Sequence, residues 1–83
     1  MTKYMQPVNP IRVWQRGDDA NYCHPVFAMG VVDVKLVPEV EYLTINGLFM
    51  RKRDIMFAEV LLDGVWTAIK DHRKAQPVDN NAE

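Results

Sequence analysis

The sequence predicts a small α+β domain, in which an antiparallel sheet of three to four strands is packed by one C-terminal amphipathic helix. Three features of the 83-residue chain lead to this prediction. Asn46-Gly47 separates two apolar, β-favouring runs, residues 32–36 alternate between apolar and charged side chains, and residues 55–69 carry apolar side chains at helical spacing. An all-β small barrel is the alternative, because residues 54–74 also allow a second hairpin.

Two runs before the Asn46-Gly47 pair predict strands. The run IRVWQ, at 11–15, mixes apolar and polar positions, and the run VFAMGVVDVKLV, at 26–37, alternates in its second half. Pro38 is expected to end the second strand. The intervening segment is rich in Gly, Asp and Asn, which are turn-forming residues.

The Asn46-Gly47 pair is the clearest local signal in the chain. Both central residues of a two-residue type I′ turn need a positive φ, and Asn-Gly is a preferred pair for them. We therefore predict a hairpin at this point. Strand alternation divides the residues before the turn between two faces, one with Val40, Tyr42 and Thr44 and the other with Glu41, Leu43 and Ile45.

Residues 54–74 allow two interpretations. Laid on a helix, their apolar side chains gather on one face, and most of their charged side chains lie on the other. The alternative is a hairpin of sequence EVLL-DG-VWTA, with Asp63-Gly64 as its turn. We favour the helix, because residues 55–62 show no two-residue alternation.

The chain divides into three parts. Residues 1–10, with two prolines, predict an extended N-terminal arm. Residues 11–75 predict a single globular domain, and residues 76–83 a flexible polar tail. A domain of this size buries a smaller share of its surface than a large one, so its margin of stability is expected to be thin.

Composition and charge narrow the class of protein. The only cysteine, Cys23, cannot form an internal disulfide, which favours a reducing compartment. The N-terminus lacks the apolar core of a signal peptide, and no window approaches a membrane-spanning length. We therefore expect a soluble cytoplasmic domain with no membrane partner. Its formal net charge of −1 is unlike that of a dedicated nucleic-acid binder.

No residues match a known type of catalytic, cofactor or metal site. The chain has no serine, and Cys23 and His24 are sequence neighbours, which places them on opposite faces of an extended segment. One cysteine and two scattered histidines do not match a metal-ligand spacing, and the four glycines lie singly rather than in a phosphate-binding loop. We therefore expect a non-enzymatic protein that uses no cofactor or metal.

A surplus of large apolar residues predicts a protein interface. On the predicted helix, Met56 and Val60 fall on the polar side one turn apart, and exposed apolar patches of this kind mark interfaces. Aromatic residues and methionine are enriched at interface centres. The candidate anchors are Trp14, Phe49, Met56 and Val60. We expect a binding module that contacts a protein partner as a subunit, adaptor or inhibitor, or a second copy as a homodimer.

The basic stretch MRKRD, at 50–54, predicts an alternative function in DNA binding. The candidate phosphate contacts are Arg51, Lys52, Arg53, Lys70, Arg73 and Lys74. No convincing helix-turn-helix precedes the hairpin, and acidic residues share the predicted helix with its cations, so nucleic acid is the weaker expectation. The plainer interpretation is a solvated strand end, where charge also discourages aggregation through the sheet edge.

Overall fold

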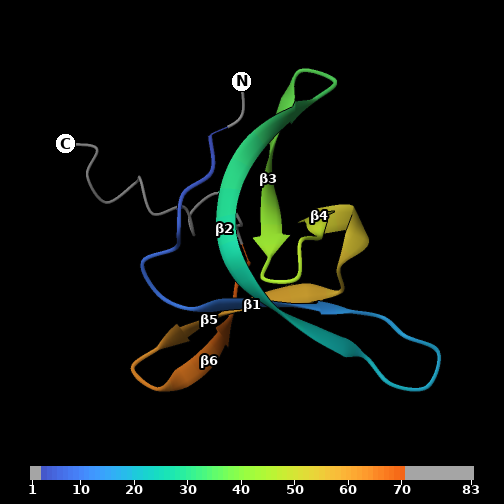
Figure 1. Cartoon of the computed structure of the whole chain (residues 1–83), viewed down its shortest axis with the longest axis vertical. Helices are drawn as coiled ribbons and strands as arrows, with labels where there is room; N and C mark the ends of the chain where they lie inside the picture. The colour runs from blue at the N-terminus through green and yellow to red at the C-terminus, as the bar shows by residue number, and fades with distance from the viewer. Residues whose placement is uncertain (1–2, 71–83) are drawn as a thin grey trace.

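The computed structural model describes residues 3–70, and within them the chain is all-β (Figure 1). The elements in chain order are β1 (Ile11–Gln15), β2 (Tyr22–Val34), β3 (Val37–Thr44), β4 (Phe49–Arg51), the 3₁₀ helix η1 (Lys52–Asp54), β5 (Phe57–Leu62) and β6 (Val65–Ala68). The six strands form one sheet in the order β4-β3-β2-β1-β5-β6, and every neighbouring pair is antiparallel.

The predicted C-terminal helix is wrong, because β5 and β6 form a hairpin where the helix was expected. Leu62 pairs with Val65 on either side of the turn. The two turn residues, Asp63 with φ of 51° and Gly64 with φ of 79°, are both left-handed, as a type I′ turn requires. The Asp-Gly turn preference therefore prevails over the helical spacing of the apolar residues.

The predicted α+β class is wrong, and the described chain is all-β. The error comes from β5, whose sequence does not look like a strand. This strand has neighbours on both sides, β1 and β6, and it uses apolar side chains on both of its faces. Such a strand shows no apolar-polar alternation. The alternative prediction, an all-β small barrel, agrees with the structure in being all-β. It differs in that β4 and β6 remain as two edges, so the sheet does not close into a barrel.

Strand β2 joins two halves of the sheet. Its first residues pair with β1, its later residues pair with β3, and a β-bulge between Val26 and Ala28 interrupts the register. A bulge bends a strand, and Figure 1 shows β2 curving along its length from one half to the other. Pro38 does not end this strand, because the chain turns earlier, at Lys35 and Leu36, and Pro38 lies in β3.

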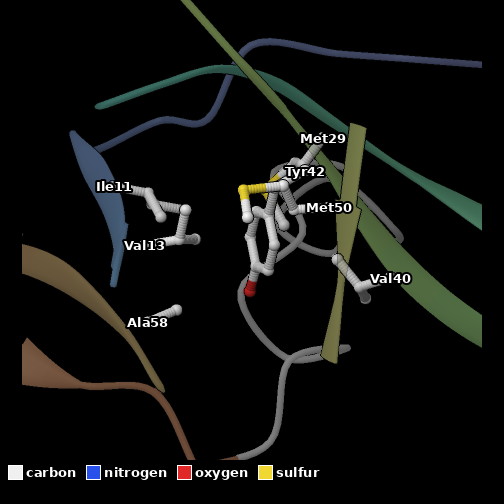
Figure 2. Packing of buried hydrophobic residues seen from close by; sticks show 7 residues of the cluster. All are labelled: Ile11, Val13, Met29, Val40, Tyr42, Met50 and Ala58. Atoms are coloured by element: carbon white, nitrogen blue, oxygen red, sulfur yellow. The ribbon is translucent and has the colours of Figure 1, made fainter. Parts of the chain in front are cut away.

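The core lies between the two halves of the bent sheet, as Figure 2 shows. One half contributes Ile11, Val13 and Ala58, and the other contributes Met29, Val40, Tyr42 and Met50. The alternation predicted for β3 is confirmed, since Val40, Tyr42 and Thr44 are all buried. Each half thus turns its inner face to the core and leaves an outer face on the opposite side.

The hairpin that joins β3 to β4 has a longer loop than the predicted two-residue turn. Thr44 accepts a hydrogen bond from the backbone N–H of Gly47 at 3.0 Å, and its own N–H donates to Leu48 at 2.9 Å. Only Gly47 in this loop has a positive φ, of 89°. This is the three-residue loop in which a turn is followed by a left-handed glycine. The buried Thr44 hydroxyl also accepts from the N–H of Leu48, which fixes the loop.

The N-terminal arm is attached to the sheet at two points. The backbones of Met5 and Met29 exchange two hydrogen bonds of 2.8 Å. The Tyr4 hydroxyl donates to the Glu41 carboxylate, and its ring packs edge-on against Phe49. Burial, together with this hydrogen bond and the charge of Glu41, raises the pKa of Tyr4 to about 12. The predicted tail, residues 76–83, lies outside the described residues.

Candidate functional site

An aromatic cluster surrounds one ion pair on the outer side of β1, β5 and β6. In the strand register, Trp14 lies opposite Phe57, Arg12 opposite Glu59, and Leu61 opposite Trp66. Residues that pair directly across two strands point to the same side of a sheet, and this side is opposite to the one that carries the core residues of β1 and β5. We call these six residues the outer face: Arg12, Trp14, Phe57, Glu59, Leu61 and Trp66.

Arg12 lies at the centre of the outer face. Its Nε donates to Oε1 of Glu59 at 2.7 Å, and 28% of its side chain and 17% of the Glu59 side chain remain exposed. The guanidinium carbon of Arg12 lies 4.0 Å from the ring centroid of Trp66 and 5.3 Å from that of Trp14. Both distances are within the range of a cation–π contact. One arginine is therefore held by a carboxylate and two indole rings together.

Glu59 connects the ion pair to the aromatic rings. Its Oε1 also accepts a hydrogen bond of 2.9 Å from Nε1 of Trp14. The hydrogen bonds from Trp14 and Arg12 lower the pKa of Glu59 below its ordinary value of 4.5, so the carboxylate is charged at neutral pH. The Trp14 ring in turn stacks on Phe57, with centroids 6.0 Å apart and planes inclined by 23°. These contacts fix the positions of the side chains in the isolated chain.

We expect this cluster to persist as the pH falls to 4.5 and to come apart only at lower pH. Because the pKa of Glu59 is lower in the folded chain than in the unfolded one, its contribution to stability is present above the unfolded value and is lost as the pH falls through the folded value. Tryptophan fluorescence, followed from neutral to acidic pH, measures the transition. Glu59→Gln should abolish it, and a transition centred above pH 4.5 would contradict the assignment.

The structure brings together only part of the predicted interface set. Trp14 belongs to the outer face. Met56 is 40% exposed and lies just before β5, where its backbone N–H donates to the Trp14 carbonyl at 2.7 Å. Phe49 is exposed on β4, in the other half of the sheet. Val60 packs against the buried core cluster. The predicted patch of Met56 and Val60 was placed on a helix, whereas the structure has strand β5 at this point, so the helical spacing that joined the two residues is not present.

Most of the outer face was missed by the sequence analysis. The helix assumption placed Glu59 and Trp66 on different faces, whereas the β5–β6 hairpin and the β1–β5 pairing bring them to the same side of the sheet. The Asp63-Gly64 pair was a signal for the hairpin. No local signal exists for the contact of Arg12 with Glu59, which are 47 residues apart.

The predicted phosphate contacts lie at opposite edges of the sheet. Arg51 ends the edge strand β4, and its Nε lies 4.0 Å from Oε2 of Glu41. The next residues, Lys52 and Arg53, are exposed in η1. Lys70 is exposed after β6, which is the other edge strand. The remaining two predicted contacts, Arg73 and Lys74, lie outside the described residues.

Residues 3–70 contain neither a metal-ligand cluster nor a membrane-spanning helix. No group of three or more His, Cys, Asp or Glu side chains in this part of the chain is placed to hold a metal ion. The same residues contain no helix whose length and apolar character would let it cross a membrane. The outer face, by contrast, combines an ion pair, two cation–π contacts and a stacked pair of rings.

Comparison with known proteins finds no matching family model, no matching protein sequence and no matching solved structure. Function is therefore inferred from the geometry and chemistry of the described residues.

Proposed function

We propose that the chain is a non-enzymatic binding module that acts in the cytoplasm by contact with a protein partner, as a subunit, adaptor or inhibitor. The outer face carries this proposal, because two tryptophan rings contact the Arg12–Glu59 pair there and Phe57 stacks on one of them. Tryptophan and arginine are over-represented among the residues that dominate binding energy at protein interfaces. Side chains that are already fixed lose less conformational freedom on binding, which favours affinity.

The charges of the outer face favour a protein over a nucleic acid. The charge of Arg12 is balanced by Glu59 at 2.7 Å, and the carboxylate repels phosphate groups. Nucleic-acid bases also need free aromatic surfaces on which to stack. Here the guanidinium of Arg12 lies over Trp66, and Trp14 is stacked on Phe57. A protein surface with apolar side chains and a few hydrogen-bonding groups fits this arrangement better.

Affinity capture with matched variants tests the proposal. Phe57→Ser removes a ring of the outer face that is 40% exposed, whereas Leu36→Ser removes a more exposed side chain from the β2–β3 turn. We expect a partner that binds the parent chain and Leu36→Ser equally, and that binds Phe57→Ser about tenfold more weakly or worse. Circular dichroism should show that both variants remain folded.

Two results would contradict the proposal. One is equal binding of every captured protein by the parent chain and Phe57→Ser. The other is retention of a mixed-sequence DNA duplex that weakens steeply with salt and is lost when Lys52 and Arg53 are both changed to alanine. That second result would support the alternative function, a DNA-binding regulator that uses its exposed cations on phosphates.

A further inference from the structure

The two edges of the sheet are protected to different degrees. At the β4 edge, the backbone N–H of Arg51 already donates to Oδ2 of Asp54 at 3.0 Å, and the chain continues into η1 with Lys52 and Arg53 exposed. Charged side chains and local turns of this kind prevent another strand from adding to an edge. Strand β6, of sequence VWTA, has no charged residue, no proline and no bulge.

The hydrogen-bond pattern of the β5–β6 hairpin shows which groups of β6 face outward. In a two-residue hairpin, the pair that closes the turn exchanges backbone hydrogen bonds, and so does every second pair after it. The N–H of Ile69, which donates to the Ala58 carbonyl at 2.8 Å, continues this series. The backbone N–H and C=O groups of Trp66 and Ala68 therefore point away from β5. Within residues 3–70, no strand lies beyond β6.

We infer that a second copy of this chain pairs with β6, strand against antiparallel strand, about a two-fold axis at Thr67. This register places Trp66 opposite Ala68 of the second copy and Ala68 opposite its Trp66. Each of these two pairs exchanges two backbone hydrogen bonds. A large side chain then lies beside a small one, and the two Thr67 residues form a favourable cross-strand pair at the centre.

Other registers fit the β6 sequence less well. A two-fold axis at Trp66 sets two indole rings directly opposite each other and matches Ala68 with Gly64, which belongs to the turn. A two-fold axis at Ala68 matches Trp66 with Lys70, which lies beyond the strand. Only the register centred on Thr67 pairs both outward-facing residues of each copy with strand residues of the other.

The charges beside β6 indicate a second copy rather than an unrelated strand. Asp63 lies in the turn just before β6, Lys70 lies two residues after its end, and both are exposed. In the register centred on Thr67, Gly64 of each copy lies opposite Lys70 of the other, so Asp63 of each copy comes close to Lys70 of the other and opposite charges meet at both ends. The two outer faces then lie on the same side of one continuous sheet.

Charge substitutions at Thr67 test the pairing. Thr67 is exposed, so the fold should tolerate a change there. In a dimer of Thr67→Lys alone, or of Thr67→Glu alone, two like charges lie opposite each other at the axis, which is unfavourable. In an equal mixture of the two variants, a dimer that contains one copy of each places opposite charges together. Thr67→Gln is the uncharged control of similar length. Sedimentation of the full chain, up to roughly 0.5 mM, detects association as weak as a millimolar Kd.

We expect the parent chain and Thr67→Gln to form dimers as concentration rises, each charged variant to associate about tenfold more weakly, and the mixture to recover dimers. A parent chain that stays monomeric, charged variants that dimerise as well as the parent, or a mixture that fails to recover would overturn the inference. The pairing uses the edge of β6 and not the exposed ring of Phe57. Phe57→Ser should therefore still dimerise, and either proposal can fail without the other.

Discussion

Replacement of Tyr42 by alanine is expected to lower the free energy of unfolding by about 3–5 kcal/mol, the range found when large aromatic side chains are removed from protein cores. Tyr42 has no exposed surface and lies between the two halves of the sheet (Figure 2). Its removal leaves a cavity where β1 and β5 face β3 and β4. Domains are stable by only about 5–15 kcal/mol, so the substitution should remove a large share of the stability and shift the urea midpoint to a much lower concentration.

Urea denaturation of Tyr42→Ala and of the control Tyr22→Ala measures how much free energy of unfolding each variant loses. Tyr22→Ala deletes the same atoms from a side chain that is 56% exposed, so its cost should be about 1 kcal/mol or less. Comparable losses in the two variants would show that the halves of the sheet do not pack on each other around Tyr42.

Local patterns predicted the parts of the fold that local interactions determine. Strand β1 and the alternation of Val40, Tyr42 and Thr44 depend on residues close in sequence, and the structure contains both. The β3–β4 hairpin follows from Asn46-Gly47, although its loop is one residue longer than the predicted turn. These features need no knowledge of distant contacts.

The misinterpretation of residues 54–74 has a physical cause in strand β5. Val60 packs against the core on the inner side, whereas Leu61 lies on the outer face with Trp66. A strand with apolar groups on both sides shows no alternation, and its apolar residues then also fit a helical spacing. Inside this window only the Asp63-Gly64 pair favours the hairpin, and the pairing of β5 with β1 depends on residues outside the window.

The outer face was predictable only in part for the same reason. Trp14 was predicted as an interface anchor because it belongs to the surplus of large apolar residues. The sequence around Arg12 does not distinguish it from a strand charge that faces solvent. Its carboxylate partner, Glu59, is adjacent only after β1 has paired with β5. The MRKRD stretch runs from the edge strand β4 into η1, where its charges are placed to discourage another strand from pairing with that edge. Its role in phosphate binding stays a prediction.

Gly64→Ala separates the hairpin from the helix by the sign of its effect. In the hairpin, Gly64 has φ of 79°, and a left-handed conformation costs a residue with a Cβ roughly 1–2 kcal/mol. In a helix, the same change would raise stability by roughly 0.5–1 kcal/mol, because glycine is a poor helix former. We therefore expect Gly64→Ala to unfold at a lower urea concentration than the parent chain.

Gly47→Ala is the matched control for this experiment. Gly47 has φ of 89°, and a Cβ built at either glycine meets nothing within 4 Å. Both substitutions therefore carry only the cost of the left-handed backbone conformation and cause no clash with neighbouring atoms. The two variants should therefore lose similar stability, about 1–2 kcal/mol each. If Gly47→Ala lost stability while Gly64→Ala gained it, the β5–β6 hairpin would be wrong, and with it both the outer face and the position of β6 at the edge of the described sheet.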